Sequence, residues 1–175
     1  MQRRMVLRHV AAAVLLPALL PLSARAERPV PPAAPAADSL AMRERWRKLL
    51  PEDRFRVLFE EATEPARSSP LDKEYRDGTY VCAACYQPLF DGAAKFDSGT
   101  GWPSFTRPLE GAMGTRRDFR LIWPRTEYHC SRCGGHQGHV FNDGPPPTGQ
   151  RWCNNGLALE FVPRGEPLPA LRDPG

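Results

Sequence analysis

The sequence has no apolar stretch of the roughly 20 residues that a membrane-spanning helix requires. Its longest such stretch, residues 10–22, is about 13 residues long and is interrupted by Pro17 and Pro21. Residues 1–26 contain no acidic residue, and without their arginines the chain has 20 basic and 20 acidic residues. The basic excess therefore belongs to the N-terminus, so the pI near 9.0 does not indicate a nucleic-acid partner.

Residues 1–26 have the order of an export signal. Arg3, Arg4 and Arg8 precede the apolar stretch, and Ala-Arg-Ala at residues 24–26 follows it as a small-x-small cleavage site. We therefore expect a signal peptide over residues 1–26 and a periplasmic or secreted protein, with a membrane anchor as the alternative. The adjacent Arg3 and Arg4 resemble a twin-arginine signal, which exports proteins that have already folded.

The rest of the chain divides into three parts. Residues 27–37 are rich in Pro and Ala and predict an extended linker. Residues 38–165 are expected to form one domain, and residues 166–175 a tail. A length of 175 residues suits one modest core, and 20 prolines argue for many loops and against a helical bundle.

Two short helices are expected at the start of the domain. Asp38 or Ser39 can cap the first, whose apolar residues would share one side up to Pro51. The second would bury apolar residues and stop before Pro65. These apolar residues are Leu40, Trp46, Leu49 and Leu50 in the first helix and Phe55, Val57, Leu58 and Phe59 in the second.

From Thr79 onward, short β-rich runs separated by Gly and Pro predict a β-sheet domain. The runs are residues 80–81, 89–90, 119–123, 139–141 and 157–162. Strand alternation near the C-terminus predicts one face that changes from polar to apolar, and hence a site at the edge of the core. The residues of that face are Arg151, Cys153, Asn155, Leu157, Leu159 and Phe161.

Four of the five cysteines form two Cys-x-x-Cys pairs, Cys82 with Cys85 and Cys130 with Cys133. This is the spacing of a metal knuckle, and the glycines at residues 134–135 give the second turn its backbone freedom. The pairs predict a tetrahedral zinc site that acts as a structural staple, with iron as a chemically possible substitute. Disulfides or redox pairs are the alternative in an exported protein.

Cys153, the fifth cysteine, belongs to neither pair. Arg151 would lie on the same strand face and favour a thiolate, and Asn155 offers an amide. His136 and His139 lie in a glycine-rich turn and could also be metal ligands, although no carboxylate partner is evident. A lone cysteine is often a buried, unreactive side chain, but these neighbours favour a catalytic role.

Three blocks of sequence stand out. They read GTGWPSF at residues 99–105, HQGHVFNDG at residues 136–144 and RWCNNG at residues 151–156. In order and separation they resemble the signature blocks of the peptide methionine-(R)-S-oxide reductase family, in its zinc-containing branch. The resemblance covers about residues 46–163 and implies a mainly β fold, with two small antiparallel sheets leaning together like a tent and short N-terminal helices.

The resemblance also implies an activity, the thiol-dependent reduction of methionine-R-sulfoxide through a sulfenic acid on Cys153. A histidine can deliver the proton that the sulfoxide oxygen needs, a role we assign to His139 with support from His136. Trp102 matches the aromatic wall that would hold the substrate methyl group. The remaining predicted site residues are Asn155, which is catalytic, and Phe141 and Arg151, which bind substrate.

This chain has Thr100 where many family members have a resolving cysteine. An external reductant, thioredoxin-like or another thiol, is therefore expected. The other implied partners are oxidised methionine residues in proteins, in a repair role under oxidative stress, and the protein is expected to be a monomer. A zinc-stapled binding module without catalysis is the first alternative. A cysteine hydrolase is the second, although nothing in the sequence specifies its oxyanion site.

Overall fold

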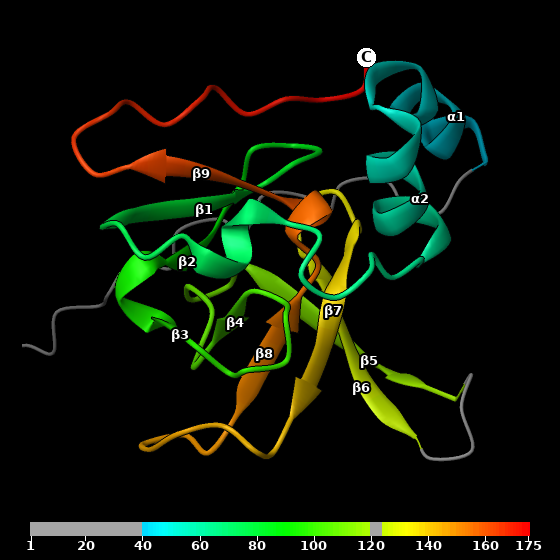
Figure 1. The fold of residues 1–175 in the computed structure, drawn as a ribbon. Coiled ribbons are helices and arrows are strands. Elements are labelled where there is room, and N and C mark those ends of the chain that lie inside the picture. Colours follow the sequence, from blue (N-terminus) through cyan, green and yellow to red (C-terminus); the bar gives the residue numbers. More distant parts are fainter. Residues whose placement is uncertain (1–39, 120–123) are drawn as a thin grey trace, which may run out of the picture. The chain divides into compact units, whose positions relative to one another are not determined.

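The computed structural model describes residues 40–119 and 124–175 of the chain. These residues form a mainly β domain with two short helices (Figure 1). The expected signal peptide at residues 1–26 and the linker at residues 27–37 lie outside the described residues, so both stay predictions. Within the described part, no helix has the length and apolar character needed to cross a membrane.

Both predicted helices are present. Helix α1 spans Leu40–Leu49 and helix α2 spans Glu52–Glu60, with Pro51 in the N-cap position of α2. The two residues predicted to cap α1, at positions 38 and 39, lie outside the described residues. Helix α2 buries the apolar residues predicted for it, which are Phe55, Val57, Leu58 and Phe59.

The single apolar side predicted for α1 is only partly correct. Trp46 is buried and stacks on Phe59 of α2 with 5.8 Å between ring centroids, and Leu50 is buried just after the helix. Leu40 and Leu49 are 85% and 45% exposed. The helix is therefore held to α2 through the Trp46 ring rather than through a continuous apolar stripe.

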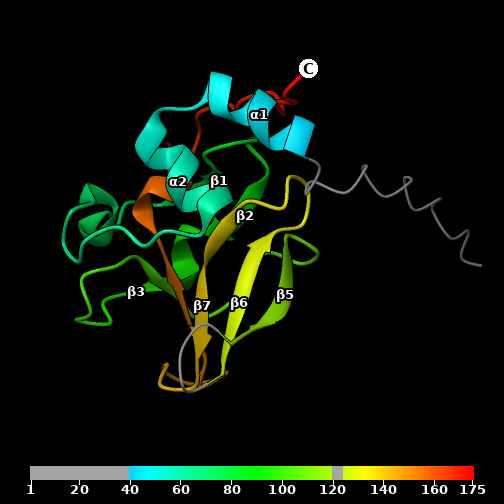
Figure 2. The same ribbon diagram turned by 90° about the vertical axis from the view of Figure 1, so that its right-hand side faces the viewer.

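The strands form two sheets, in the orders β2-β1-β9 and β3-β4-β8-β7-β6-β5, and their pairings are antiparallel. Figure 2 shows β7, β6 and β5 side by side in the larger sheet. The predicted fold class is thus confirmed. The strand bounds are β1 Gly78–Cys82, β2 Pro88–Asp91, β3 Lys95–Phe96, β4 Ser104–Phe105, β5 Met113–Asp118, β6 Arg125–Cys130, β7 His136–Phe141, β8 Arg151–Asn154 and β9 Leu159–Pro163.

Short 3-10 turns connect some of these elements. They are η1 Pro70–Lys73, η2 Gly92–Ala94 and η3 Gly156–Ala158. The β-rich run predicted at residues 119–123 is not confirmed, because Phe119 follows the end of β5 and is 72% exposed, and residues 120–123 lie outside the described part.

Aromatic rings join the two sheets. Phe90 of β2 stacks on Phe105 of β4 with 4.0 Å between ring centroids, and Tyr80 of β1 meets Phe105 edge-on at 4.9 Å. Within the six-stranded sheet, Tyr128 of β6 meets Trp152 of β8 at 4.9 Å. Since burying one such ring stabilises the fold by about 1.5–3 kcal/mol, these contacts hold β4 and β8 firmly in place.

The continuous face predicted from residue 151 to residue 161 is wrong. Strand β8 belongs to the six-stranded sheet and β9 to the three-stranded one, and η3 turns the chain between them. Glu64 fixes this turn, since its carboxylate accepts the backbone N–H groups of Gly156 and Leu157, each at 2.7 Å. Arg151 and Cys153 therefore share a strand face, but the face does not continue past β8.

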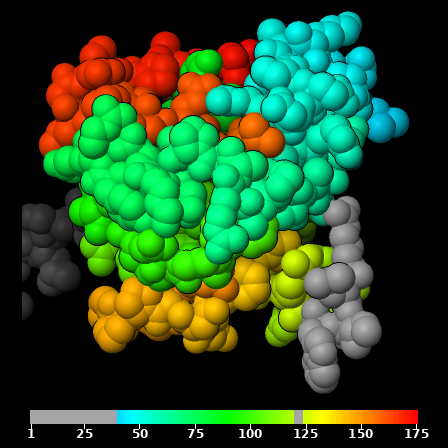
Figure 3. Space-filling model, in the orientation of Figure 1, coloured from blue at the N-terminus to red at the C-terminus, as the bar shows by residue number. Residues whose placement is uncertain are grey.

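The C-terminal segment, predicted as a tail, packs against the domain. The Arg172 guanidinium donates to the carbonyls of Ala84 and Ala83 at 2.6 and 2.7 Å, and its backbone N–H donates to the carbonyl of Cys85 at 3.0 Å. In Figure 3 this red segment lies at the same end of the domain as the cyan helices. The segment thus braces the turn that carries the first pair of cysteines.

Candidate functional site

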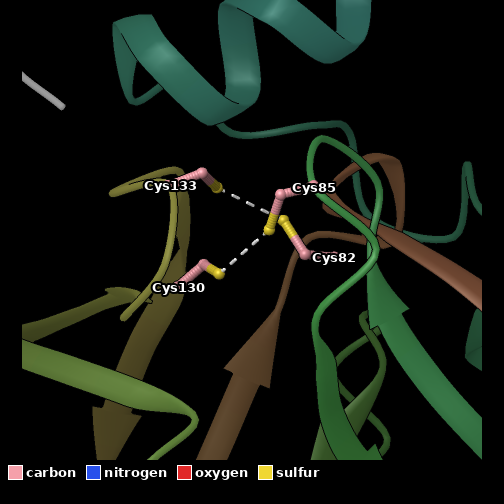
Figure 4. A group of neighbouring side chains, drawn as sticks. All are labelled: Cys82, Cys85, Cys130 and Cys133. Atoms are coloured by element: carbon pink, nitrogen blue, oxygen red, sulfur yellow. Dashed lines mark hydrogen bonds between the residues drawn. The ribbon is translucent and has the colours of Figure 1, made fainter. Parts of the chain in front are cut away.

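Four cysteines from the two sheets converge on one point (Figure 4). All four are buried, and their Sγ atoms lie within 4.8 Å of one another. The closest pairs, Cys82 with Cys133 and Cys85 with Cys130, are 3.6 Å apart. Four thiolates about 2.3 Å from a tetrahedral ion would be separated by about 3.8 Å. The cluster therefore fits a four-coordinate metal, which would join the end of β1 to the turn between β6 and β7.

Both knuckles close with the same backbone geometry. Tyr86 donates its N–H to the carbonyl of Cys82, and Gly134 donates to Cys130, each at 2.9 Å. Both donors adopt left-handed backbone angles, with φ of 62° for Tyr86 and 72° for Gly134, and at position 134 glycine supplies the backbone freedom predicted for that turn. The close sulfur pairs run between the knuckles at a distance far above the roughly 2.05 Å of a disulfide. The geometry therefore favours metal binding over the disulfide alternative.

Cys153 lies on β8, between β4 and β7. The strand register places Ser104 opposite it on one side and His139 opposite it on the other. Cys153 lines a pocket of about 150 Å³. Five of the predicted site residues line this pocket: Trp102, His139, Phe141, Cys153 and Asn155. Four lining residues were not predicted: Thr63, Arg125, Gly138 and Asn154.

The surroundings of Cys153 favour its thiol form. Burial raises the pKa of Cys153 above its usual value, and the charge of Arg151 opposes this shift. Hydrogen bonds with Ser104, Thr100 and Arg151 act in the same direction as that charge without overcoming burial. Arg151 therefore has the predicted influence on the sulfur, but a general base is needed to make the thiolate.

Arg151 does not line the pocket. Its Nε and one terminal nitrogen donate to the two carboxylate oxygens of Asp143 at 2.8 and 2.9 Å. The guanidinium also lies 4.2 Å from the centroid of the Phe141 ring. Arg151 is therefore placed behind Phe141, where it orients the ring that faces the pocket.

His139 has a carboxylate partner that the sequence did not reveal. Its Nε2 is hydrogen-bonded to Oδ2 of Asp118 at 2.7 Å, and Asp118 also accepts from Arg125 at 2.7 Å. Burial lowers the pKa of His139, while the hydrogen bond to Asp118 opposes the shift. The carboxylate partner that was not evident in the sequence is therefore Asp118, and His139 is favoured in its neutral form.

His136 is buried outside the pocket, with its ring centroid 5.4 Å from that of His139. Its Nδ1 is hydrogen-bonded to Oε1 of Glu127 at 2.7 Å. The other oxygen of Glu127 lies 3.1 Å from Nδ1 of His129 and 3.2 Å from Nε of Arg116. His136 is therefore tied to a second carboxylate and contacts His139 through its ring.

Glu64 holds two walls of the pocket through its backbone. Its N–H donates to the side-chain oxygen of Asn155 at 3.1 Å, and its carbonyl accepts from Nε1 of Trp102 at 3.1 Å. The same residue caps the turn after β8 with its carboxylate, as described above. One residue thus sets the positions of the indole face and the amide, although nothing local in the sequence marks it for that role.

Gln137 connects the pocket to the metal centre. Its side-chain nitrogen donates to Sγ of Cys82 at 3.6 Å, and its side-chain oxygen accepts from Asn154 at 3.3 Å. Its backbone carbonyl accepts from the backbone and side chain of Asn155 at 2.8 and 3.1 Å. Because Gln137 is fully buried, these contacts fix the end of β8 relative to the first knuckle.

Comparison with known proteins agrees with this geometry. The family model for the SelR domain matches residues 50–163. A protein named peptide methionine sulfoxide reductase MsrB from Bradyrhizobium diazoefficiens is 49% identical over 122 residues, covering 69% of this chain and 88% of the relative. Proteins of the same name from Leptospira interrogans and Thiobacillus denitrificans are 48% and 49% identical, covering 67% and 68% of this chain and 91% of each relative. The chain belongs to the SelR domain family.

Proposed function

We propose that this protein is a peptide-methionine (R)-S-oxide reductase, which reduces methionine-R-sulfoxide in peptides and proteins with Cys153 as the nucleophile. The relatives are named peptide methionine sulfoxide reductase MsrB, which supports this activity. One observation carries the residue assignment: Cys153 faces His139 across neighbouring strands in a small pocket, apart from the four metal-site cysteines. A binding module stapled by metal would not need this arrangement.

The pocket suits the end of an oxidised methionine side chain. A methyl sulfoxide has an apolar methyl group beside a polar sulfur–oxygen bond, and it needs an aromatic face and a hydrogen-bond donor. The indole of Trp102, fixed by the carbonyl of Glu64, supplies the face. His139 and the Asn155 amide supply polar groups on the same pocket. With methyl and oxygen both held, one configuration at sulfur presents its open side to Cys153, and the family relationship indicates R.

The chemistry follows from the position of His139 opposite Cys153, and the directions of both pKa shifts agree with it. Neutral His139 accepts the proton of the Cys153 thiol as Sγ attacks the sulfoxide sulfur. The histidine then returns that proton to the oxygen. The oxygen becomes bonded to Sγ of Cys153, and the bonds from the substrate sulfur to the oxygen and to Sγ both break, which frees methionine. The thiol loses two electrons and becomes a sulfenic acid, while the sulfoxide gains them and becomes methionine. Asp118 keeps the imidazole oriented throughout.

We assign zinc to the four-cysteine centre, with iron as the substitute that the same thiolates accept. A bound ion there would supply folding free energy and hold the two sheets together. Through its hydrogen bonds to Cys82 and Asn154, Gln137 would hold the end of β8 in place relative to the metal centre. The reaction itself is performed by the residues of the Cys153 pocket.

The proposal includes how Cys153 is reduced after each reaction and where the protein works. The four other cysteines of the chain lie in the metal centre, so the sulfenic acid on Cys153 has no resolving partner within the chain. An external reductant, either thioredoxin-like or another thiol, is needed for turnover. The sequence of residues 1–26 supports export, and hence work on oxidised methionine residues in periplasmic or secreted proteins.

A peptide that contains racemic methionine sulfoxide tests the function. With dithiothreitol present, the purified protein should form methionine and leave the S epimer. Cys153→Ser should abolish the reaction while keeping the metal, since the nucleophile and the metal ligands are separate residues. Equal consumption of both epimers, or turnover by Cys153→Ser, would refute the mechanism. If the wild-type protein forms no methionine, the binding module is favoured instead. If it hydrolyses the peptide, the cysteine hydrolase is favoured.

A further inference from the structure

Residues 166–175 contact both knuckles of the four-cysteine centre, and we call them the C-terminal strap. The strap follows β9 and lies outside residues 50–163, which the family model matches. Figure 1 shows it running from the end of β9 back to α1. Its contacts with the first knuckle come from Arg172, and those with the second knuckle come from Asp173. The strap is therefore not part of the matched family domain.

Arg172 holds the backbone of the first knuckle at three successive carbonyls. Its side chain donates to Ala84 at 2.6 Å and to Ala83 at 2.7 Å, and its backbone N–H donates to Cys85 at 3.0 Å. These three residues are at most 1% exposed, so water has little access to their carbonyls. Loss of the guanidinium would therefore leave two buried carbonyls without their donor.

Aromatic rings fix the guanidinium in this position. Its central carbon lies 4.4 Å from the centroid of the Tyr86 ring and 5.9 Å from that of the Trp46 ring. Tyr86 closes the first knuckle through its N–H, and Trp46 is the buried residue of α1. The strap is thus anchored both to the knuckle and to the helix beside it.

Asp173 joins the strap to the second knuckle. Its two carboxylate oxygens accept from one terminal nitrogen of Arg132 at 2.8 and 2.9 Å, and Arg132 lies between Cys130 and Cys133 in the sequence. The first knuckle begins at the end of β1 in the three-stranded sheet, whereas the second connects β6 and β7 of the six-stranded sheet. Two adjacent strap residues therefore link turns that belong to different sheets.

A metal ion held by the four cysteines can leave only when the knuckles open. The exposed fractions of Cys82, Cys85, Cys130 and Cys133 are 0%, 1%, 0% and 5%. A chelator therefore reaches the thiolates only after a local opening of the structure. Because the strap is bonded to both knuckles, an opening that separates them must also break hydrogen bonds of Arg172 or Asp173.

We propose that the C-terminal strap is a clamp that slows the loss of metal from the four-cysteine centre, an inference that rests on the proposed metal assignment. The strap links the knuckles through bonds that do not depend on the ion. Arg172 also brings a positive charge to the first knuckle, where it is favourable because four thiolates carry more negative charge than a divalent ion neutralises. The strap thus makes opening less frequent without supplying a ligand.

Release of zinc from the zinc-loaded, full-length protein to the dye pyridylazoresorcinol tests the clamp. Arg172→Met keeps an unbranched apolar stem and removes the guanidinium. It should release zinc about tenfold faster than the wild type, because bonds from a charged donor to buried acceptors are lost. Asp173→Asn weakens a link whose carboxylate is 75% exposed, so it should speed release only about twofold.

Arg164→Met is the matched control. Arg164 also pairs with an aspartate, Asp77, but Asp77 precedes β1 at the end opposite to Cys82. The same substitution is thus made at an arginine of the same segment of the chain that does not contact either knuckle. The control should release zinc at the wild-type rate.

Amide hydrogen exchange in the metal-free protein tests the clamp without the ion. The N–H of Tyr86 closes the first knuckle on the carbonyl of Cys82. In Arg172→Met this N–H should exchange about tenfold faster than in the wild type. The amides that pair β7 with β8 should keep their wild-type rates, since the strap does not contact that pair of strands.

The proposal is wrong if Arg172→Met releases zinc no faster than Arg164→Met. It is also wrong if exchange becomes faster in all strands together, because a general loss of stability is not a clamp. Should Arg172→Met fail to fold, zinc release by Asp173→Asn at the wild-type rate has the same meaning. A wild-type protein that binds no metal would refute the metal assignment instead, and exchange at Tyr86 would still decide whether the strap holds the knuckle.

Discussion

Replacing Glu127 by Gln should destabilise the protein by an amount that depends strongly on pH. Glu127 is 1% exposed, and its carboxylate is bonded to His136 and His129 at 2.7 and 3.1 Å and lies 3.2 Å from Nε of Arg116. Burial opposes its ionisation, but these partners outweigh burial and lower the pKa of Glu127 from 4.5 to about 2. The ionised carboxylate is therefore a source of folded-state stability.

The magnitude follows from linkage. Because the folded pKa lies below the unfolded value, the contribution is fully present above about pH 4.5 and is lost as the pH falls toward 2. A difference of about 2.5 units corresponds to about 3 kcal/mol at pH 7, since each unit is worth 1.36 kcal/mol. Near pH 3 about 1 kcal/mol remains. Glutamine keeps the volume of the side chain and does not titrate.

Urea unfolding of the wild type and of Glu127→Gln at pH 7 and near pH 3 measures this difference. Both proteins carry the same metal centre, so loss of metal in acid affects both. Glu160→Gln is the matched control, because Glu160 pairs with Arg54 at a part-exposed position and its loss should cost less than about 1 kcal/mol. A destabilisation that is the same at both pH values would show that packing, rather than charge, is responsible.

Three further variants test other parts of the site. Cys130→Ser should lose the bound metal and melt at a lower temperature, whereas Cys153→Ser keeps the metal; equal metal content in both would refute the metal assignment. Without added reductant, Thr100→Cys should form a disulfide with Cys153 after one turnover. The wild type should convert about one equivalent of substrate and then stop, with Cys153 as a sulfenic acid that reacts with dimedone. Mass spectrometry distinguishes the two products. Asp118→Asn removes the carboxylate that raises the pKa of His139, so the acid limb of the pH profile of kcat/KM should move to lower pH, with kcat reduced about tenfold. An unchanged profile would exclude His139 as the proton carrier.

The metal centre could be predicted from the sequence because each half of it is local. A Cys-x-x-Cys turn specifies its own geometry, and both turns have the hydrogen bonds that such knuckles use. The two helices and the β-rich half could be predicted for the same reason. The placement of Cys153 beside His139 could be inferred only through the family resemblance, since it depends on the pairing of β7 with β8.

The carboxylates could not be found in this way. Asp118 reaches His139 because β5 pairs with β6, and β6 with β7, which brings together residues that are 21 positions apart. Glu127 and His129 are two positions apart on one strand, so the sequence indicates that they share a face of the sheet. It does not indicate that this face is the buried one. Pairing register, rather than composition, decides which acid meets which histidine.

Gly138 is part of a pattern that predicts a turn, but its role in the structure is a different one. A glycine between two histidines indicates a flexible turn, yet Gly138 lies inside β7. A Cβ atom at this position would lie 1.9 Å from the carbonyl oxygen of Cys153, so glycine is required by the close approach of β8. That approach is also what sets His139 opposite Cys153. Any larger residue would have to push the two strands apart, and the proton carrier would then move away from the sulfur that it serves.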